Sequence, residues 1–270
     1  MKALKIVSLL AVSALLVTGC GAGSSSSSEA STDSAAESSS SESDELIVAT
    51  EAGFAPYEYM KGNEVVGVDM DIAQAIADEM GKTLVIQNMD FDAALVAVQQ
   101  GKVDFAAAGI SVDPEREKVM DFSTNYVDST EVVVVSADAP AVTEPTGEAL
   151  MDKVVAVQQG NIADLWCSNT DNTTPKEVRR YTKFALAAED LKAGKVDCIV
   201  MDELPAKDLV EANTELKILE GDPLFQDQYA IAVKKGNTEM LDQINGVVEK
   251  LVADGKIDEF IANHSAAEAE

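Results

Sequence analysis

The four-residue motif Gly-Lys-Val-Asp occurs twice in this chain, each time between a helical pattern and a short β-branched run. Gln100-Gly-Lys-Val-Asp104 precedes residues 105–108, and Ala193-Gly-Lys-Val-Asp197 precedes residues 198–201. Both copies stand at the same point of an alternating series of strands and helices, which is the pattern of an α/β protein. The repetition predicts two lobes of similar topology.

The periodicity places the elements of both lobes. In the first set we expect strands at 46–49, 83–87 and 105–108, with helices at 71–80 and 91–100 that each end at a glycine. In the second set we expect strands at 154–158, 178–181 and 198–201, a helix beginning at 163, and a helix at 184–193.

The connections between the two sets define the lobe boundaries. The β runs at 131–135 and 228–233 are interpreted as crossings between lobes, and an amphipathic helix at 238–253 is expected to return to the first lobe. The predicted first lobe therefore comprises residues 45–130 and 228–265, and the second lobe residues 131–227.

The N-terminus predicts export. Residues 4–17 follow a basic start and form an apolar run too short to span a bilayer comfortably, ending in Val17-Thr-Gly-Cys20. Small residues before a cysteine resemble the bacterial lipobox. Residues 1–19 are therefore predicted as a signal peptide and Cys20 as a lipidated residue that anchors the chain to the cell membrane, outside the cytoplasm. An ordinary signal peptide with an incidental cysteine is the alternative. Residues 20–44, rich in Ser, Ala and acids, are expected to be a flexible tether.

Charge excludes one class of partner. Residues 1–19 contain two lysines and no acids, so the remainder carries 18 basic and 48 acidic side chains, a formal charge of −30. Such a surface repels phosphate backbones, so nucleic acid is not expected as a partner.

The chain lacks the residue sets of common catalytic and metal sites. Its one histidine, His264, lies near the C-terminus outside any patterned element, which argues against Ser-His-Asp and Cys-His catalysis. No clustered His/Cys spacing suggests a metal, and no glycine-rich phosphate-binding motif is present. We therefore expect no metal, no cofactor and no catalytic residue.

Cys167 and Cys198 form either a disulfide or two buried thiols.

Three segments at strand ends carry candidate binding residues, because ligands of open α/β sheets lie beyond the carboxyl ends of the strands. The segment from Glu51 to Tyr59 offers Phe54 and Tyr57 as an apolar wall, or as edge-of-core packing. In Gly109-Ile-Ser-Val-Asp-Pro-Glu-Arg116, Ser111 offers donors and Pro114 is placed to open a helix.

The charged members of these segments have competing interpretations. Arg116 could bind a carboxylate with its two-pronged guanidinium, or pair with a neighbouring acid on a solvated helix. Asp202, in Met201-Asp-Glu-Leu-Pro205, could face a ligand or cap a helix that starts near Pro205. An Arg on one lobe and an Asp on the other would satisfy the carboxylate and the ammonium of an amino acid only when the lobes close.

The chain resembles the polar amino-acid family of bacterial ABC-importer substrate-binding proteins. The resemblance rests on four segments in the family's order and covers about residues 45–263. They are Phe54-Ala-Pro-Tyr57, Val66-Gly-Val-Asp-Met-Asp71, Gly109-Ile-Ser-Val-Asp-Pro-Glu-Arg116 and Asp197-Cys-Ile-Val-Met-Asp202. It implies a two-lobed fold of the periplasmic-binding-protein-like type II class, with two crossing strands and the ligand in the cleft.

The resemblance also implies roles for single residues. Arg116 would hold the ligand α-carboxylate, helped by backbone amides near Ser111 and in the Gly160-Asn161-Ile162 turn. Asp202 and the Gly109 carbonyl would take the α-ammonium. The side chain would lie between Phe54 and Phe91, with Glu51 and Gln158 at its polar end. The family usually has Gly-Thr followed by a small or hydroxylated residue at the turn, so a hydroxyl contact is lost and Ile162 narrows the pocket.

This family would bind a free polar or basic amino acid and deliver it to an ABC permease and its ATPase, as a monomer. Two alternatives stay open on the sequence. One is a dehydratase on the same fold, with Glu51 as the one plausible general acid. The other is a ligand-sensing lipoprotein that feeds no importer.

Overall fold

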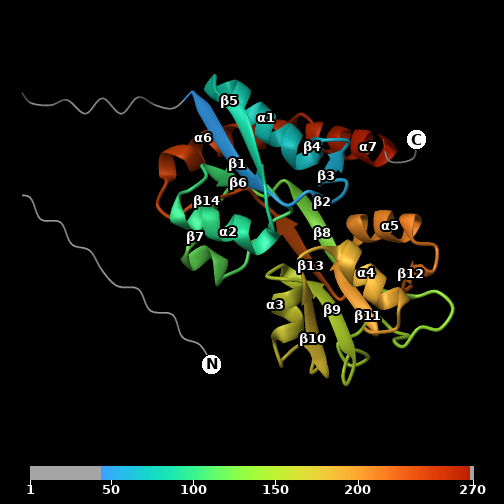
Figure 1. Ribbon diagram of the computed structural model, residues 1–270. Helices are drawn as coiled ribbons and strands as arrows, with labels where there is room; N and C mark the ends of the chain where they lie inside the picture. The colour runs from blue at the N-terminus through green and yellow to red at the C-terminus, as the bar shows by residue number, and fades with distance from the viewer. Residues whose placement is uncertain (1–43, 268–270) are drawn as a thin grey trace, which may run out of the picture. The chain divides into compact units, whose positions relative to one another are not determined.

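Two β-sheets, each with its own helices, organise the computed structural model, which describes residues 44–267 (Figure 1). The predicted signal peptide, Cys20 and the tether up to residue 43 lie outside the described residues. The sheets define two lobes, here called the first and the second in the order in which the chain enters them. The predicted α/β architecture with two lobes is confirmed.

The first lobe contains a five-stranded sheet in the order β5-β1-β6-β14-β7. Strand β1 runs parallel to β5 and β6, while β14 is antiparallel to β6 and β7. The strands are β1 (Glu45–Thr50), β5 (Thr83–Asn88), β6 (Phe105–Ala106), β7 (Met120–Phe122) and β14 (Ala232–Lys234). The three strands predicted for this lobe are present, with β6 ending two residues earlier than expected.

Within residues 44–267, four helices belong to the first lobe. They are α1 (Val68–Met80), α2 (Phe91–Gln100), α6 (Thr238–Ala253) and α7 (Lys256–Ala267). Helices α2 and α6 have the predicted bounds, whereas α1 begins three residues early, directly after Gly67. A Cβ at Gly67 would lie 2.1 Å from the Tyr57 carbonyl oxygen, and its φ of 135° suits only glycine. Helices α6 and α7 both pack on α1, as expected of helices that return to this lobe.

The only histidine is part of this packing. His264 lies in α7, so the expectation that it falls outside any patterned element is wrong. Its ring nitrogens lie 3.1 Å from the Tyr59 hydroxyl and 2.9 Å from Asp71 Oδ2. The ring therefore links the last helix to the start of α1 and takes no part in the cleft.

The second lobe contains a six-stranded sheet. Its order is β10-β9-β11-β8-β12, with β13 paired to β8. The strands are β8 (Val127–Ser136), β9 (Val154–Gln158), β10 (Glu177–Tyr181), β11 (Cys198–Asp202), β12 (Leu216–Ile218) and β13 (Phe225–Tyr229). The helices are α3 (Ile162–Ser168), α4 (Phe184–Lys192) and α5 (Glu203–Ala212). All strands and helices predicted for this lobe are present.

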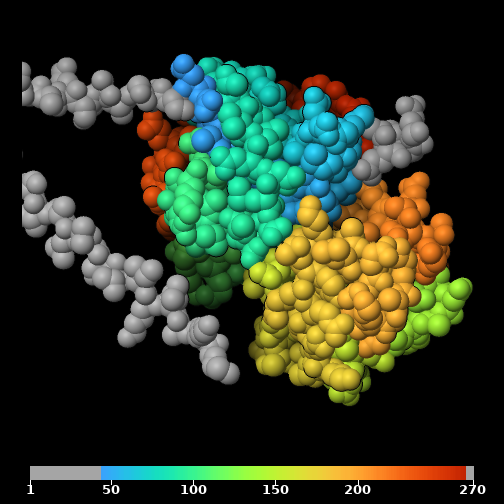
Figure 2. Space-filling view, viewed as in Figure 1, coloured from blue at the N-terminus to red at the C-terminus, as the bar shows by residue number. Residues whose placement is uncertain are grey.

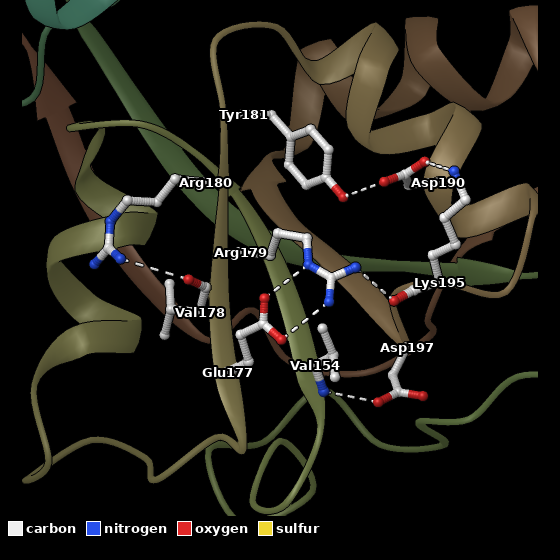
Figure 3. A network of polar contacts seen from close by, with 9 residues as sticks. All are labelled: Val154, Glu177, Val178, Arg179, Arg180, Tyr181, Asp190, Lys195 and Asp197. Atoms are coloured by element: carbon white, nitrogen blue, oxygen red, sulfur yellow. Dashed lines mark hydrogen bonds and ion pairs between the residues drawn. The ribbon is translucent and has the colours of Figure 1, made fainter.

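The repeated motif performs the same structural task in both lobes. Asp104 accepts a 2.7 Å hydrogen bond from the Ile47 amide at the start of β1, and Asp197 accepts one of the same length from the Val154 amide at the start of β9 (Figure 3). The motif glycines, Gly101 and Gly194, end their helices with φ of 65° and 67°. Each motif therefore stops a helix and aligns the next strand with a neighbouring parallel strand, β1 in the first lobe and β9 in the second, which confirms the inferred similarity.

A surface network supports the second copy of the motif. The Arg179 guanidinium contacts Glu177 through two nitrogens and donates to the Lys195 carbonyl, while the Tyr181 hydroxyl and Lys195 Nζ both donate to Asp190 (Figure 3). These contacts tie β10 to the end of α4. All but the part-buried Tyr181–Asp190 bond are solvent-exposed, so their effect on stability is small.

Strands β8 and β13 pair antiparallel where the chain passes between the sheets (Figure 1). Strand β8 is longer than the predicted run, spanning ten residues. The single run expected at 228–233 is divided, because β13 ends at Tyr229 in one sheet and β14 begins at Ala232 in the other. The interpretation of both runs as crossings agrees with this path.

Two local features were not predicted. Strands β2 (Gly53–Phe54), β3 (Glu58–Lys61) and β4 (Glu64–Val66) form a small antiparallel sheet beside the first lobe. The helix expected after Pro114 is a single 3₁₀ turn, η1 (Arg116–Lys118).

The cysteine question is resolved in favour of thiols. Cys167 and Cys198 are both free and buried in the apolar core of the second lobe. Burial raises the pKa of Cys167 to about 12, so the thiol stays protonated at neutral pH.

No helix within residues 44–267 is both long and apolar enough to cross a membrane.

Candidate ligand-binding site

The candidate residues meet where the two lobes face each other. Seven of the ten candidate residues line one small cavity. Of the other three, Glu51 contacts Gln158 and Arg116 contacts Ser111, while Gly160 precedes Asn161 and accepts from Arg116. The lining comprises Phe54, Phe91, Ala108, Gly109, Ser111, Gln158, Asn161, Ile162 and Asp202. The first five belong to the first lobe and the last four to the second, so residues up to about 150 positions apart in the sequence form one site.

The lobes are closed around this cavity. Its volume is about 10 Å³, close to the space that a single water molecule needs. Figure 2 shows the contact from one side, with atoms of the first lobe (blue to green) directly against atoms of the second (yellow and orange). One such contact joins Gln159 Nε2 to Asp92 Oδ2 at 2.6 Å. An amino acid can therefore reach the site only when the lobes separate.

Arg116 is buried, with 6% of its surface exposed. Its guanidinium donates hydrogen bonds to the Ser111 carbonyl at 2.7 Å and to the Gly160 carbonyl of the second lobe at 2.8 Å. The guanidinium carbon lies 5.6 Å from the centre of the Phe91 ring. Asp113 accepts from the Arg116 backbone amide and not from the guanidinium. The alternative of a surface ion pair is therefore wrong for this arginine.

Burial also changes the electrostatics of Arg116. Burial lowers the pKa of the guanidinium to about 10, although the negative charges of Asp113, Asp227 and Asp202 raise it in part. The side chain remains a cation at neutral pH. Its hydrogen bonds go to carbonyl groups, which are weaker acceptors than a carboxylate. The guanidinium therefore has an orientation suited to a planar anion.

Asp202 ends β11 and has 3% of its surface exposed. It occupies the N-cap position of α5, yet its side chain makes no capping hydrogen bond. One carboxylate oxygen accepts instead from the Ser129 hydroxyl at 3.0 Å and from the Tyr229 hydroxyl. Burial raises the pKa of Asp202, and these two donors oppose the rise. Asp202 therefore stands at the N-cap position, as the capping alternative expected, but its side chain does not cap the helix.

Glu51 is almost fully buried and finds partners on the second lobe. Gln158 Nε2 donates to its carboxylate at 2.9 Å, and Lys183 Nζ lies 3.4 Å from its other oxygen. Burial raises the pKa of Glu51, whereas the Lys183 ammonium and the Gln158 amide lower it. A buried carboxylate is costly without a donor, and both groups that stabilise Glu51 reach it across the cleft.

The aromatic residues differ in their surroundings. Phe54 stacks on Phe184 of the second lobe, with centroids 6.1 Å apart and planes 24° apart. A Cβ at Gly109 would lie 2.7 Å from the Phe54 ring, so that position requires glycine. Phe91 lies beneath Arg116. Tyr57 is 1% exposed and contacts Tyr229 edge to face, which makes it a core residue and not part of the cavity wall.

Two backbone amides of the turn before α3 already donate hydrogen bonds within the second lobe. The Gly160 amide donates to Asp164 at 3.0 Å, and the Asn161 amide donates to the Gln158 carbonyl at 3.3 Å. The Asn161 side chain caps α3 by accepting from the Asp164 amide. In this closed arrangement the turn offers the Gly160 carbonyl to Arg116.

Several residues of the site were missed by the sequence analysis. Ser129, Glu131, Asp227 and Tyr229 surround Asp202 from the crossing strands, and no short motif marks them. Asp69 lies within a quoted segment but received no role. Its carboxylate accepts from the Gly109 amide at 2.8 Å and from the Tyr126 hydroxyl at 2.7 Å. Asp69 therefore fixes the backbone of the loop that carries Gly109.

A larger cavity of about 790 Å³ adjoins the site. Ile162 contributes to both cavities, and Ser129, which lines the larger one, bonds to Asp202 in the smaller. The larger wall includes Trp166 and Phe225, whose rings stack 5.3 Å apart. It contains none of the ten candidate residues.

The two lobes, the crossing strands and the buried charges in the cleft define a binding protein that closes around a small solute. The chain matches the family model described as bacterial extracellular solute-binding proteins, family 3, over residues 46–266. It belongs to this family, which confirms the resemblance and its type II periplasmic-binding-protein-like fold. The family works with ABC transporters outside the cytoplasm.

Three relatives illustrate the similarity. The putative ABC transporter arginine-binding protein 2 of Escherichia coli K12 is 30% identical over 216 residues, which is 77% of this chain and 85% of the relative. The glutamine-binding protein GlnH of Bacillus subtilis 168 is 27% identical over 265 residues, or 95% and 94% of the two chains. The crystal structure of AbpA from Streptococcus pneumoniae bound to L-arginine has a TM-score of 0.78 at 34% identity, covering 84% of this chain and 97% of AbpA.

Proposed function

We propose that this chain captures a free polar or basic amino acid between its lobes and delivers it to the permease of an ABC importer. The observation that carries the proposal is the pair of buried opposite charges, Arg116 and Asp202, presented by different lobes at one closed cavity. A zwitterion satisfies both charges at once, and a single charged solute satisfies only one.

The hydrogen bonds of the closed site suggest how the ligand is held. The α-carboxylate takes the place of the carbonyl groups that now accept from Arg116, because a two-pronged contact with an anion is stronger. The α-ammonium donates to Asp202 and to the Gly109 carbonyl. Since each partner comes from a separate lobe, binding favours the closed arrangement over the open one.

The far end of the site supports a polar or basic side chain. Phe54 and Phe91 provide apolar walls, and Glu51 with Gln158 provides a carboxylate and an amide. A guanidinium or ammonium can replace Lys183 as the cation beside Glu51, because the lysine side chain is half-exposed and its ion pair with Glu51 is long, at 3.4 Å. Relatives that bind arginine and glutamine accord with this assignment.

We propose that the protein has no enzymatic activity. Burial raises the pKa of Glu51, a property that a general acid would also need, so the dehydratase alternative has one observation in its favour. Incubating the protein with prephenate or arogenate tests it. We expect no aromatic product above background, and product formation would overturn the assignment.

The membrane attachment is proposed from the sequence alone. Cys20 follows Val17-Thr-Gly19 and would carry the lipid, with residues 1–19 removed and residues 20–44 as the tether. We further propose a monomer with lobe boundaries after residues 130 and 227, within the paired strands β8 and β13. Cys20→Ser should release the protein from the membrane fraction into the soluble extracytoplasmic fraction.

Calorimetry of the chain from residue 21 onward, titrated with each of the twenty amino acids, tests the proposal. We expect a polar or basic amino acid to bind with one site per chain and to raise the melting temperature, since a ligand that binds only the folded state stabilises it. Binding of none of the twenty would overturn the proposal. A sensor and an importer component both bind, and growth dependence on the ligand as sole nitrogen source separates them.

A further inference from the structure

Glu131 is a buried acid beside the proposed ammonium site that no motif had marked. It lies on β8 directly opposite Asp202 of β11, as its cross-strand partner. The two residues are 0% and 3% exposed. Oxygen atoms of Glu131, Asp202 and Asp227 all lie within 4.8 Å of one another. Three carboxyl groups therefore share a small volume that water barely reaches.

The hydrogen bonds of this cluster are distributed unequally. Asp202 accepts from the hydroxyls of Ser129 and Tyr229, whereas neither oxygen of Glu131 accepts a hydrogen bond from a described residue. An ionised carboxylate without donors is costly in a protein interior. A second ionised carboxylate beside it adds repulsion. The oxygens of Asp227 also lack a close donor among the described residues, but this residue is only half-buried, and Ser111 and the Arg116 charge oppose the rise that burial causes in its pKa. Glu131 is fully buried and has no such partner among the described residues, so it is the member of the cluster that is least able to carry a charge.

The elements packed around Glu131 supply no compensating cation. Strand β11 brings Asp202, strand β13 brings Asp227, and helix α3 brings the Cys167 thiol. The first acid of α5, Glu203, accepts a 3.1 Å hydrogen bond from Thr130. Neighbouring residues of a strand point to opposite faces, so Glu203 lies on the face away from Glu131. The Arg116 charge acts on Asp202 and Asp227 and is not among the charges that affect Glu131. Every titratable group that faces Glu131 is thus an acid or a thiol.

We infer that Glu131 is a positioning residue, a neutral carboxylic acid at physiological pH whose proton is donated to Asp202. The donated hydrogen bond would be the third on the Asp202 carboxylate, after those of Ser129 and Tyr229. It would fix the orientation of Asp202 and add no negative charge of its own beside the ligand ammonium. The role in ligand binding rests on the proposed function, whereas the protonation state does not.

The charge balance of the site supports this assignment. With Glu131 neutral, the buried charges of Arg116 and Asp202 balance each other, and a zwitterion adds one charge of each sign. Asp227 is the remaining carboxyl group of the cluster, and the Arg116 charge favours its ionised form. Burial and the neighbouring carboxylates also raise the pKa of Glu131 well above its ordinary value. An ionised Glu131 would leave an unpaired negative charge both before and after binding.

Infrared difference spectroscopy tests the protonation state directly. Wild type minus Glu131→Gln at pH 9 should show the carbonyl stretch of a protonated carboxylic acid. At this pH Asp69 and Asp227 are ionised, with pKa values of about 6 and about 7. Glu58, another buried acid with a raised pKa, cancels because it is present in both proteins. Glu203→Gln is the matched control and should leave the band in place. If the spectrum of wild type minus Glu131→Gln lacks this band at both pH 7 and pH 9, the inference is overturned.

Amino-acid affinity tests the positioning role. Glu131→Gln keeps a neutral donor at this position and should bind within about threefold of wild type. Glu131→Val suits a strand but has no donor, and should bind about tenfold more weakly, in line with the loss of one hydrogen bond to a charged group. Equal losses in both variants would contradict a neutral donor. If the wild type shows the infrared band but binds no amino acid, the protonation state stands and the proposed function, with the positioning role, fails.

Discussion

The guanidinium of Arg116 joins the two lobes, because it donates to the Ser111 carbonyl of its own lobe and to the Gly160 carbonyl of the other. The same two donors are the group expected to hold a ligand carboxylate. One side chain therefore serves both the closed arrangement and the ligand. This coupling explains why a binding protein of this shape can signal occupancy through lobe closure.

Replacing Arg116 by lysine tests the need for a two-pronged cation. Arg116→Lys keeps the charge but loses the planar fork, so we expect amino-acid affinity to fall by at least about tenfold. Arg116→Ala should cost about 2–5 kcal/mol of binding free energy. Isothermal titration calorimetry measures both. Arg179→Lys, which alters an exposed arginine that contacts Glu177, is the control and should bind as wild type does.

Asp202→Asn tests the opposite charge. The amide can still accept from Ser129 and Tyr229 but no longer neutralises an ammonium, so binding should weaken by about 2–5 kcal/mol. Glu203→Gln changes the adjacent acid, which is partly exposed and pairs with Lys207, and should leave affinity unchanged. Wild-type affinity in Asp202→Asn, with a normal near-ultraviolet circular dichroism spectrum, would refute the role of this carboxylate.

Glu51→Gln tests which side chains the site prefers. The substitution keeps the hydrogen-bonding shape but removes the charge that Gln158 and Lys183 now contact. We expect arginine and lysine to lose about tenfold or more in affinity, as for the loss of one desolvated charge pair. Glutamine should lose much less. An unchanged ratio of arginine to glutamine affinity would show that Glu51 does not contact the ligand side chain.

The buried acids predict how stability depends on pH. Burial and the Asp202 charge raise the pKa of Asp227 from 3.8 to about 7, so the folded state holds a proton that the unfolded state releases. The contribution of Asp227 to stability is therefore complete below pH 3.8 and is lost as pH rises to about 7. Each pH unit in this window lowers the free energy of unfolding by up to about 1.4 kcal/mol for one proton.

Urea unfolding of wild type and Asp227→Asn at pH 5 and pH 8 measures this contribution. The wild type should lose more stability than the variant between the two pH values. Other raised acids, such as Asp69, titrate in both proteins and cancel in the comparison. An equal loss in both proteins would show that Asp227 is ionised throughout.

Local patterns were sufficient to predict much of the fold. Helix α2 and strand β9 have the bounds that periodicity and terminal residues indicated, because a glycine in the left-handed conformation ends the helix and an uninterrupted apolar run forms the buried strand. The repeated Gly-Lys-Val-Asp motif predicted the paired lobes, since its aspartate makes the same strand contact twice. These features depend on neighbours close in the sequence.

The polar surroundings of Asp202 could not be predicted in this way. Ser129 and Tyr229 reach it from 73 and 27 residues away, through the pairing of β8 with β11 and β13. Strand register decides these contacts, and no local pattern specifies the register between strands that distant. The cross-cleft partners of Glu51 have the same origin, because they depend on how closely the two lobes approach each other.

A crystal structure with the bound amino acid tests the central claim most directly. We predict that the Arg116 guanidinium contacts the ligand α-carboxylate with two nitrogens, and that the Asp202 carboxylate lies within hydrogen-bond distance of the α-ammonium. A ligand seated in the neighbouring 790 Å³ cavity, or either charged group turned to bulk water, would contradict the account.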